Sequence, residues 1–223
     1  MKHHRLLLVY LAMMLALATG TTFAKQADLP DVTEDGLHRV PDSRLALVYA
    51  EPGADLKFYT RIRLLDAYVA FKKNWERNQR SSSAGSFKVT SRDVENIKTR
   101  LSEEFYAVFK KTLEDGGYEV VDESGDDVLL VRPAIINLDV NAPDTPRAGS
   151  SMTYTSSAGE MTLYVELYDS VTGDLMAKAL DRRIDNNPYY TWTNSVTNKA
   201  AAEKILKGWA TILVKALDEA RQP

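Results

Sequence analysis

Two stretches with the periodicity of helices flank a stretch with the periodicity of strands, and this order limits the folds open to the chain. In the first stretch, apolar residues between positions 94 and 109 recur at intervals of three and four, which places them on one face of a helix. Thr90 and Asp93 have the spacing of a capping box, with Asp in place of the usual Glu. Gly116 and Gly117 then predict the end of this helix.

The second helical stretch spans about residues 198–220. Its apolar stripe contains Ala201, Ile205, Trp209, Ile212, Leu213, Ala216 and Leu217. Because Trp209 lies inside this stripe, we expect its side chain in the core rather than in a ligand site. Each predicted helix therefore needs an apolar surface to cover.

Between the helices the periodicity changes to two, as in a strand with one buried face. One face carries Met161, Leu163, Val165 and Leu167. A turn-rich segment at residues 169–174 then predicts a hairpin whose second strand starts near Leu175. Upstream, one face of a predicted strand carries Ala134, Ile136, Leu138 and Val140. Apolar runs at residues 45–50 and 58–71 indicate further strands.

The simplest way to bury these faces is a two-layer α+β sandwich, in which two helices pack on one face of a largely antiparallel sheet. We expect residues 44–223 to form this single domain, because no internal repeat is apparent. Residues 25–43 have few bulky apolar side chains, which predicts a flexible leader. Residues 72–86 are polar and end in a Ser-rich stretch, which predicts a loop.

Residues 1–24 have the order of a secretory signal peptide. Lys2 and Arg5 supply a basic region, and residues 6–18 form an unbroken apolar run. A bilayer-spanning helix needs about twenty apolar residues, so we expect no transmembrane anchor in the mature chain. Small side chains predict cleavage between Ala24 and Lys25, with a cut after Ala18 as the alternative. This segment predicts export to a bacterial periplasm.

The composition excludes several kinds of chemistry. The chain contains no cysteine, which removes disulfides, Cys-ligated zinc, a thiol nucleophile and a lipid anchor on an N-terminal cysteine. His38 is the only histidine left after removal of the signal peptide, so a Ser-His-Asp triad or a histidine-rich metal site lacks its residues. The glycines form no phosphate-binding pattern. We therefore expect no cofactor and no metal.

The charge excludes one class of partner. The whole chain has a formal net charge of −3, and the signal peptide removes two cations and no acid, which leaves −5. Nucleic-acid binders normally carry a basic excess, so nucleic acid is not an expected partner. An acidic group lacks the glycine that a calcium loop requires and indicates a solvated turn. It consists of Asp122, Glu123, Asp126 and Asp127.

Carboxylates alone can hydrolyse glycosides, which makes a carboxylate-dependent hydrolase the least favoured of three functional hypotheses. The acids on or beside predicted strands are Asp66, Asp139, Glu160 and Glu166. Nothing in the sequence brings two of them to a defined separation. The sequence therefore favours a protein that is not an enzyme.

Two groups are the candidate binding residues. The first is a set of four cations around one aromatic, with Glu76 as a counter-charge: Lys72, Lys73, Trp75, Arg77 and Arg80. Such a group suits anionic lipid headgroups or polymers, and the alternative is an ordinary solvated loop. The second group comprises Tyr189, Tyr190 and Trp192. Loop aromatics either anchor an interface or fold back over the sheet, and both hypotheses stay open.

Four strings together resemble one protein family. They are EPGADL at residues 51–56, VAFKKNW at 69–75, VLLVRPAIINLDVNAPD at 128–144 and ELYDSVTGDLMAKALDRR at 166–183. The chain resembles the DUF3313 family of envelope proteins and lipoproteins of Gram-negative bacteria from about Gly36 onward, most specifically at Arg132-Pro133-Ala134. The resemblance implies an envelope location. It supplies no reaction and no catalytic residues, and the lipid-anchored cysteine of the lipoprotein members is missing here.

These observations favour a non-enzymatic periplasmic interaction module that presents a sheet face or edge to an envelope protein or an anionic envelope component. The alternative is a protein that binds a small ligand or an envelope glycan through the cationic and aromatic segments.

Overall fold

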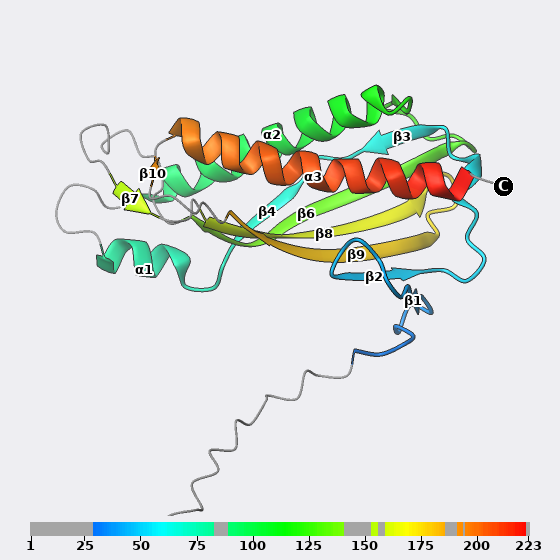
Figure 1. Cartoon of the computed structure of the whole chain (residues 1–223), viewed down its shortest axis with the longest axis horizontal. Coiled ribbons are helices and arrows are strands. Elements are labelled where there is room, and N and C mark those ends of the chain that lie inside the picture. Colours follow the sequence, from blue (N-terminus) through cyan, green and yellow to red (C-terminus); the bar gives the residue numbers. More distant parts are fainter. Residues whose placement is uncertain are drawn as a thin grey trace, which may run out of the picture. The chain divides into compact units, whose positions relative to one another are not determined.

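A mixed eight-stranded sheet and two long helices make up most of the chain that the structure, a computed structural model, describes (Figure 1). The described residues are 29–82, 89–140, 153–155, 159–185, 191–193 and 195–221. The described part of residues 31–223 forms one compact unit. The predicted signal peptide lies outside the described residues.

The element bounds follow the chain. The strands are β1 (His38–Arg39), β2 (Leu47–Ala50), β3 (Arg61–Leu64), β4 (Tyr68–Phe71), β5 (Glu119–Val120), β6 (Val128–Val140), β7 (Thr153–Thr155), β8 (Gly159–Asp169), β9 (Leu175–Ile184) and β10 (Thr191–Thr193). The helices are the 3-10 helix η1 (Leu56–Phe58), α1 (Trp75–Ser82), α2 (Ser91–Asp115) and α3 (Ser195–Arg221).

The main sheet has the strand order β1-β2-β9-β8-β6-β3-β5, and β4 pairs with β6. Neighbours from β1 to β6 are antiparallel, whereas β3 and β4 run parallel to β6, and β5 runs parallel to β3. β3 and β4 follow one another along the same side of β6. The predicted largely antiparallel sheet is confirmed.

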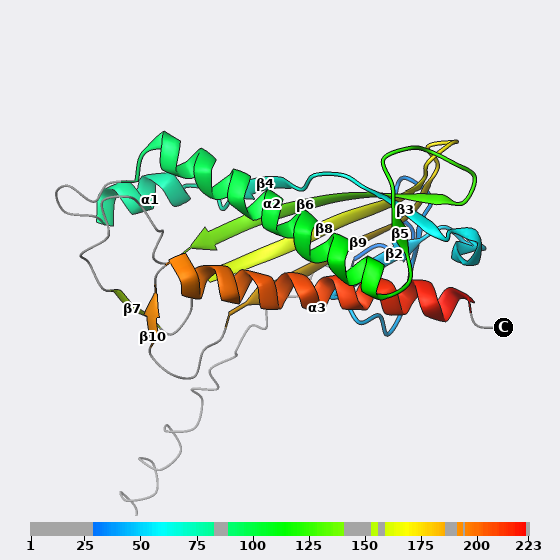
Figure 2. The ribbon, with the colours of Figure 1, turned by 90° about the horizontal axis from the view of Figure 1, so that it is seen from above.

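α2 and α3 pack on one face of this sheet, as predicted (Figure 2). Thr90 and Asp93 form the predicted capping box, and α2 ends at Asp115, directly before Gly116. Phe105 and Phe109 stack in the core with their ring centroids 3.9 Å apart. The apolar faces recognised in the sequence therefore meet in one core.

Trp209 lies in the core, as the stripe predicts, with 2% of its surface exposed. Its indole Nε1 donates a hydrogen bond to the carboxylate of Asp181 over 2.7 Å. Asp181 also accepts from the backbone N–H of Ala46 and from Nε of Arg183. Each of these donors stabilises a charge that would otherwise be costly to bury.

The two helices lie close together near the end of α2 and diverge toward their N-termini (Figure 2). A Cβ atom added at Gly116 would lie 2.8 Å from a methyl group of Val214, so a larger residue at this position would require Val214 to move. Near the same point, the hydroxyl of Tyr118 donates to Asp218 over 2.9 Å. The divergence at the other end positions the pocket described below.

Three local expectations are wrong. The polar segment after β4 contains the helix α1 and is not the loop that its composition predicts. Trp75, the single large apolar residue of α1, is buried in a small cluster with Val89 and Val94. The apolar run at residues 58–71 is two strands, β3 and β4, and not one. In α3, Leu206 and Ala210 are fully buried while Ala216 is exposed, so the buried stripe is rotated from the expected one.

The expected alternation in β6 is also interrupted. Ile135 is fully buried, and Leu138 lies on the same buried face although the two residues have opposite parity. A bulge between Ile136 and Asp139, with Asn137 at φ 52°, adds the residue that changes the phase. The alternation expected in β8 holds, because Met161, Leu163, Val165 and Leu167 are all buried.

Residues 29–43 of the predicted flexible leader belong to the described part of the chain, and some of them contact the sheet. β1 pairs with β2, and Leu37 is 2% exposed. Asp35 forms an ion pair with Lys178 of β9. Residues 31–39 therefore contact the sheet.

Candidate functional site

The structure does not gather the first candidate group around an exposed aromatic. Trp75 is 3% exposed, its ring stacks on Phe71 with centroids 4.0 Å apart, and its Nε1 donates to the carbonyl of Val140. Lys73 and Arg77 are exposed, and the side chain of Arg80 lies outside the described part. Binding of an anionic surface by these cations stays a prediction, without Trp75 as a surface contact.

Lys72 connects two acids that the sequence could not place together. Asp139 of β6 and Glu160 of β8 are strand partners, and Nζ of Lys72 lies 3.1 Å from a carboxylate oxygen of each. These hydrogen bonds raise the pKa of Lys72. Arg182 adds a further ion pair to Glu160. The two acids are thus paired with cations at one end of the sheet.

The second candidate group, the loop aromatics, lies mostly outside the described residues. Tyr189 and Tyr190 lie outside the described residues. The backbone of Trp192 belongs to β10, which pairs with β7, and its side chain lies outside the described part. A binding role for this group stays a prediction.

A pocket of about 790 Å³ lies between the diverging parts of α2 and α3 and the sheet end formed by β6 and β8. Its walls are mainly apolar and include Ile97, Leu101, Leu138, Met161, Ala201 and Ile205. Volumes of roughly 300–1,000 Å³ and apolar walls are typical of sites for small molecules. The three consecutive alanines at residues 200–202 also line the pocket, and their small side chains leave space beside α3.

Charged side chains also line this pocket. Lys199 of α3 lies 3.1 Å from Glu104 of α2 and 3.6 Å from Glu203. Ion pairs with both acids raise the pKa of Lys199. The first of these pairs spans the gap between the two helices. The pocket therefore combines mainly apolar walls with charged lining residues, which suits an amphipathic molecule.

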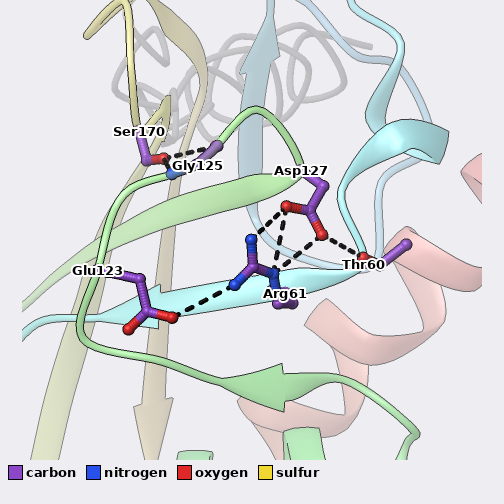
Figure 3. A network of polar contacts seen from close by, with 6 residues as sticks. All are labelled: Thr60, Arg61, Glu123, Gly125, Asp127 and Ser170. Carbon is purple, nitrogen blue, oxygen red and sulfur yellow. Dashed lines mark hydrogen bonds and ion pairs between the residues drawn. The ribbon is translucent and has the colours of Figure 1, made fainter.

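A separate polar network joins β3 to the loop before β6 (Figure 3). Nη2 of Arg61 lies 2.6 Å from Asp127, and Nη1 lies 3.3 Å from Glu123. The hydroxyl of Thr60 donates to Asp127 over 2.7 Å. Within the acidic group expected as a solvated turn, Asp127 and Glu123 thus bind a cation of the protein itself. This network joins the loop before β6 to β3 and so stabilises the loop.

The Arg61 network predicts a dependence of stability on pH. The guanidinium of Arg61, and then the hydroxyl of Thr60, lower the pKa of Asp127. A carboxylate with a lowered pKa stabilises the fold above its unfolded pKa of about 3.9, and this stabilisation is lost as the pH falls through the folded value. The melting temperature of Asp127→Asn should therefore fall below that of the wild type near pH 7, and the difference should shrink below about pH 4. If the difference in melting temperature between the two proteins stayed constant from about pH 7 to about pH 2, the ion pair of Asp127 with Arg61 would not stabilise the fold.

Taken together, the fold and the pocket define a two-layer α+β protein with a ligand-sized cavity between its helices and its sheet. The chain belongs to the family described as Protein of unknown function (DUF3313), whose sequence model matches residues 32–213. The resemblance seen in the sequence is thereby confirmed. No curated protein matches the sequence.

Several solved structures have a distantly similar fold. PelC from Paraburkholderia phytofirmans, a dodecamer, is 11% identical over 74% of this chain and 95% of its own, with a TM-score of 0.39. Protein XCC0632 from Xanthomonas campestris, of DUF330, is 16% identical over 73% of this chain and 85% of its own, with a TM-score of 0.41. A DUF4136 protein from Bacteroides thetaiotaomicron is 12% identical over 75% of this chain and 94% of its own, with a TM-score of 0.35.

Two further findings concern the described residues alone. No helix among them has both the length and the apolar character needed to cross a bilayer. They also contain no group of three or more His, Cys, Asp or Glu side chains arranged to hold a metal ion.

Sequence reasoning missed the pocket because its walls look like ordinary core positions. Ile97, Leu101, Ala201 and Ile205 all belong to the predicted helical stripes, and a stripe does not reveal where two helices diverge. The available signal is the alanine run at residues 200–202, which supplies less side-chain volume than the rest of the stripe.

Proposed function

We propose that this protein is a non-enzymatic binding protein of the bacterial cell envelope, and that the pocket between α2, α3 and the sheet holds a small amphipathic ligand. One observation carries the proposal, namely a pocket of about 790 Å³ whose walls are mainly apolar and also carry charged side chains. The sequence favours an interaction module over a ligand binder, and this cavity reverses the preference. The basic and apolar N-terminal segment supports an envelope location.

The acids beside the pocket support binding without catalysis. A general acid needs a raised pKa so that it still holds its proton near neutral pH. The pKa of Glu160 is instead lowered, chiefly by its hydrogen bond from Arg182 and further by Lys72. Asp139 shares Lys72 with it. Glu160 therefore suits a structural role beside the pocket better than the role of a general acid.

Saturable binding of an amphipathic probe tests the proposal. Dansyl-labelled undecanoic acid should bind the mature protein with a blue-shifted emission and should raise the melting temperature. Ala201→Trp places a large ring in the pocket and should weaken binding at least about tenfold, which corresponds to about 1.4 kcal/mol.

Ala216→Trp provides the matched control. It makes the same change on the same helix at an exposed position outside the pocket lining, and its affinity should equal that of the wild type. Failure of the wild type to bind the probe, or equal affinity in Ala201→Trp, would overturn the proposal.

A further inference from the structure

The side of β6 opposite β8 is covered unevenly. β3 and β4 pair with successive parts of β6 along this side. β5 pairs with β3 and covers that half, whereas β4 pairs with β6 alone among the described strands. The outer edge of β4 thus has no strand partner in the described part of the chain. Such an edge is a template for pairing with another strand.

A groove of about 460 Å³ runs beside this edge. It lies between residues 66–69, at the start of β4, and residues of α2 from Glu95 to Glu103. The hydroxyl of Ser102 donates to the carbonyl of Ala67 over 2.9 Å, which fixes the helix next to the strand. Tyr68 is 68% exposed at the same place. An edge strand facing a helix across a groove suits an extended peptide, whose backbone pairs with the strand while alternate side chains face the helix.

The charges of the groove select the peptide. Asp66, Glu95 and Glu103 line it, and the cation among its lining residues, Lys98, is paired with Glu95 over 2.8 Å. The groove is therefore net acidic. A second copy of the chain is a poor occupant, because pairing two β4 edges would bring two acidic grooves together. A basic strand offers the complementary charge.

We infer that the groove between β4 and α2 binds an extended, basic peptide segment of a partner protein by adding it to the sheet at β4. Glu103 lines both this groove and the proposed ligand pocket, but the other residues of the two linings differ. The inference does not depend on the ligand pocket. The sequence predicts that a sheet face or edge contacts an envelope partner. The groove beside β4 specifies where this contact would lie and which charge the partner would carry.

The test uses the mature protein and capped hexapeptides of alternating lysine and valine. The lysine peptide should bind in calorimetric titration and should slow hydrogen exchange of the β4 amides. A peptide with the same side chains but N-methylated at alternate residues should bind at least about tenfold more weakly, because it lacks donors for the strand ladder. A glutamate–valine peptide should bind more weakly still.

Charge reversal in the protein supplies the second arm. Asp66→Lys with Glu95→Lys should weaken binding of the lysine peptide at least about tenfold. Glu114→Lys with Asp115→Lys makes the same change on exposed residues of α2 outside the groove and should leave the affinity unchanged. No binding of the lysine peptide, equal binding of its N-methylated form, equal affinity in the groove variant, or protection outside β4 would each overturn the inference.

Discussion

Replacing Trp209 by alanine is expected to lower the free energy of unfolding by about 3–5 kcal/mol, the usual range for a buried Trp or Phe truncation. The side chain is 2% exposed and lies between α3 and the sheet. The truncation removes apolar contacts, leaves a cavity, and takes one of three donors from the buried carboxylate of Asp181. Urea unfolding followed by circular dichroism measures the change.

Trp209→Phe separates the two contributions. Phenylalanine keeps most of the apolar contact and removes the indole N–H, so we expect a loss of about 1.5–3 kcal/mol, as for a hydrogen bond to a charged group. If Trp209→Ala cost less than about 1 kcal/mol, the residue would not belong to the core. Equal losses in the two variants would show that the hydrogen bond to Asp181 accounts for the whole effect.

Gly159→Ala is expected to be the other severe substitution. Gly159 has φ 152°, a conformation that L-residues rarely adopt, and an added Cβ would lie 2.0 Å from the backbone oxygen of Asp139. Backbone strain and overpacking together predict a loss of about 2–6 kcal/mol. Because Gly159 and Asp139 both line the pocket, affinity for the amphipathic probe should fall as well.

Gly208→Ala is the matched control. Gly208 lies on an exposed part of α3, and an added Cβ would meet nothing within 4 Å. Alanine in a helix interior is favoured over glycine by about 0.5–1 kcal/mol, so this variant should be slightly more stable than the wild type. Thermal melts that rank Gly159→Ala as the milder change would contradict the pairing of β6 and β8 at this point.

The sequence was sufficient where one periodicity persists over a long element. Thr90, Asp93 and Gly116 mark the ends of α2 by local chemistry that needs no tertiary context. The alternation in β8 determines which face is buried. A shift of one residue would move Leu163 and the other apolar side chains of this face to the opposite side of the sheet. The two-layer arrangement then follows from the need to cover these faces.

Sequence reasoning failed where one tertiary contact outweighs a local pattern. Trp75 donates a hydrogen bond to the carbonyl of Val140, 65 residues away, and this contact holds the start of α1 in an otherwise polar segment. Asn137 adopts a left-handed conformation and changes the phase of β6 in the middle of an apolar run. Composition and periodicity predict neither feature. The burial of Trp75 depends on Val140, which is distant in the sequence, and alternation cannot locate the bulge in β6.

The candidate site could be predicted less well than the fold. The cations near Trp75 were conspicuous in sequence, yet Lys72 is paired with Asp139 and Glu160, which belong to two other strands. The pocket, conversely, is formed by stripe residues whose only unusual feature is the size of the alanines near Ala201. A cavity depends on the angle between two helices, and that angle is set by contacts such as the one between Gly116 and Val214.

Photoaffinity labelling tests most directly whether the pocket between α2, α3 and the sheet is the ligand site. A fatty acid with a diazirine in its chain should label peptides that contain Ile97, Leu101, Met161 and Ile205, which line the apolar walls. Labelling should saturate, should be competed by the unlabelled acid, and should be lost in Ala201→Trp. Labelling that does not saturate, or that falls on Phe58 and the helix-free face of the sheet, would contradict a ligand site in this pocket.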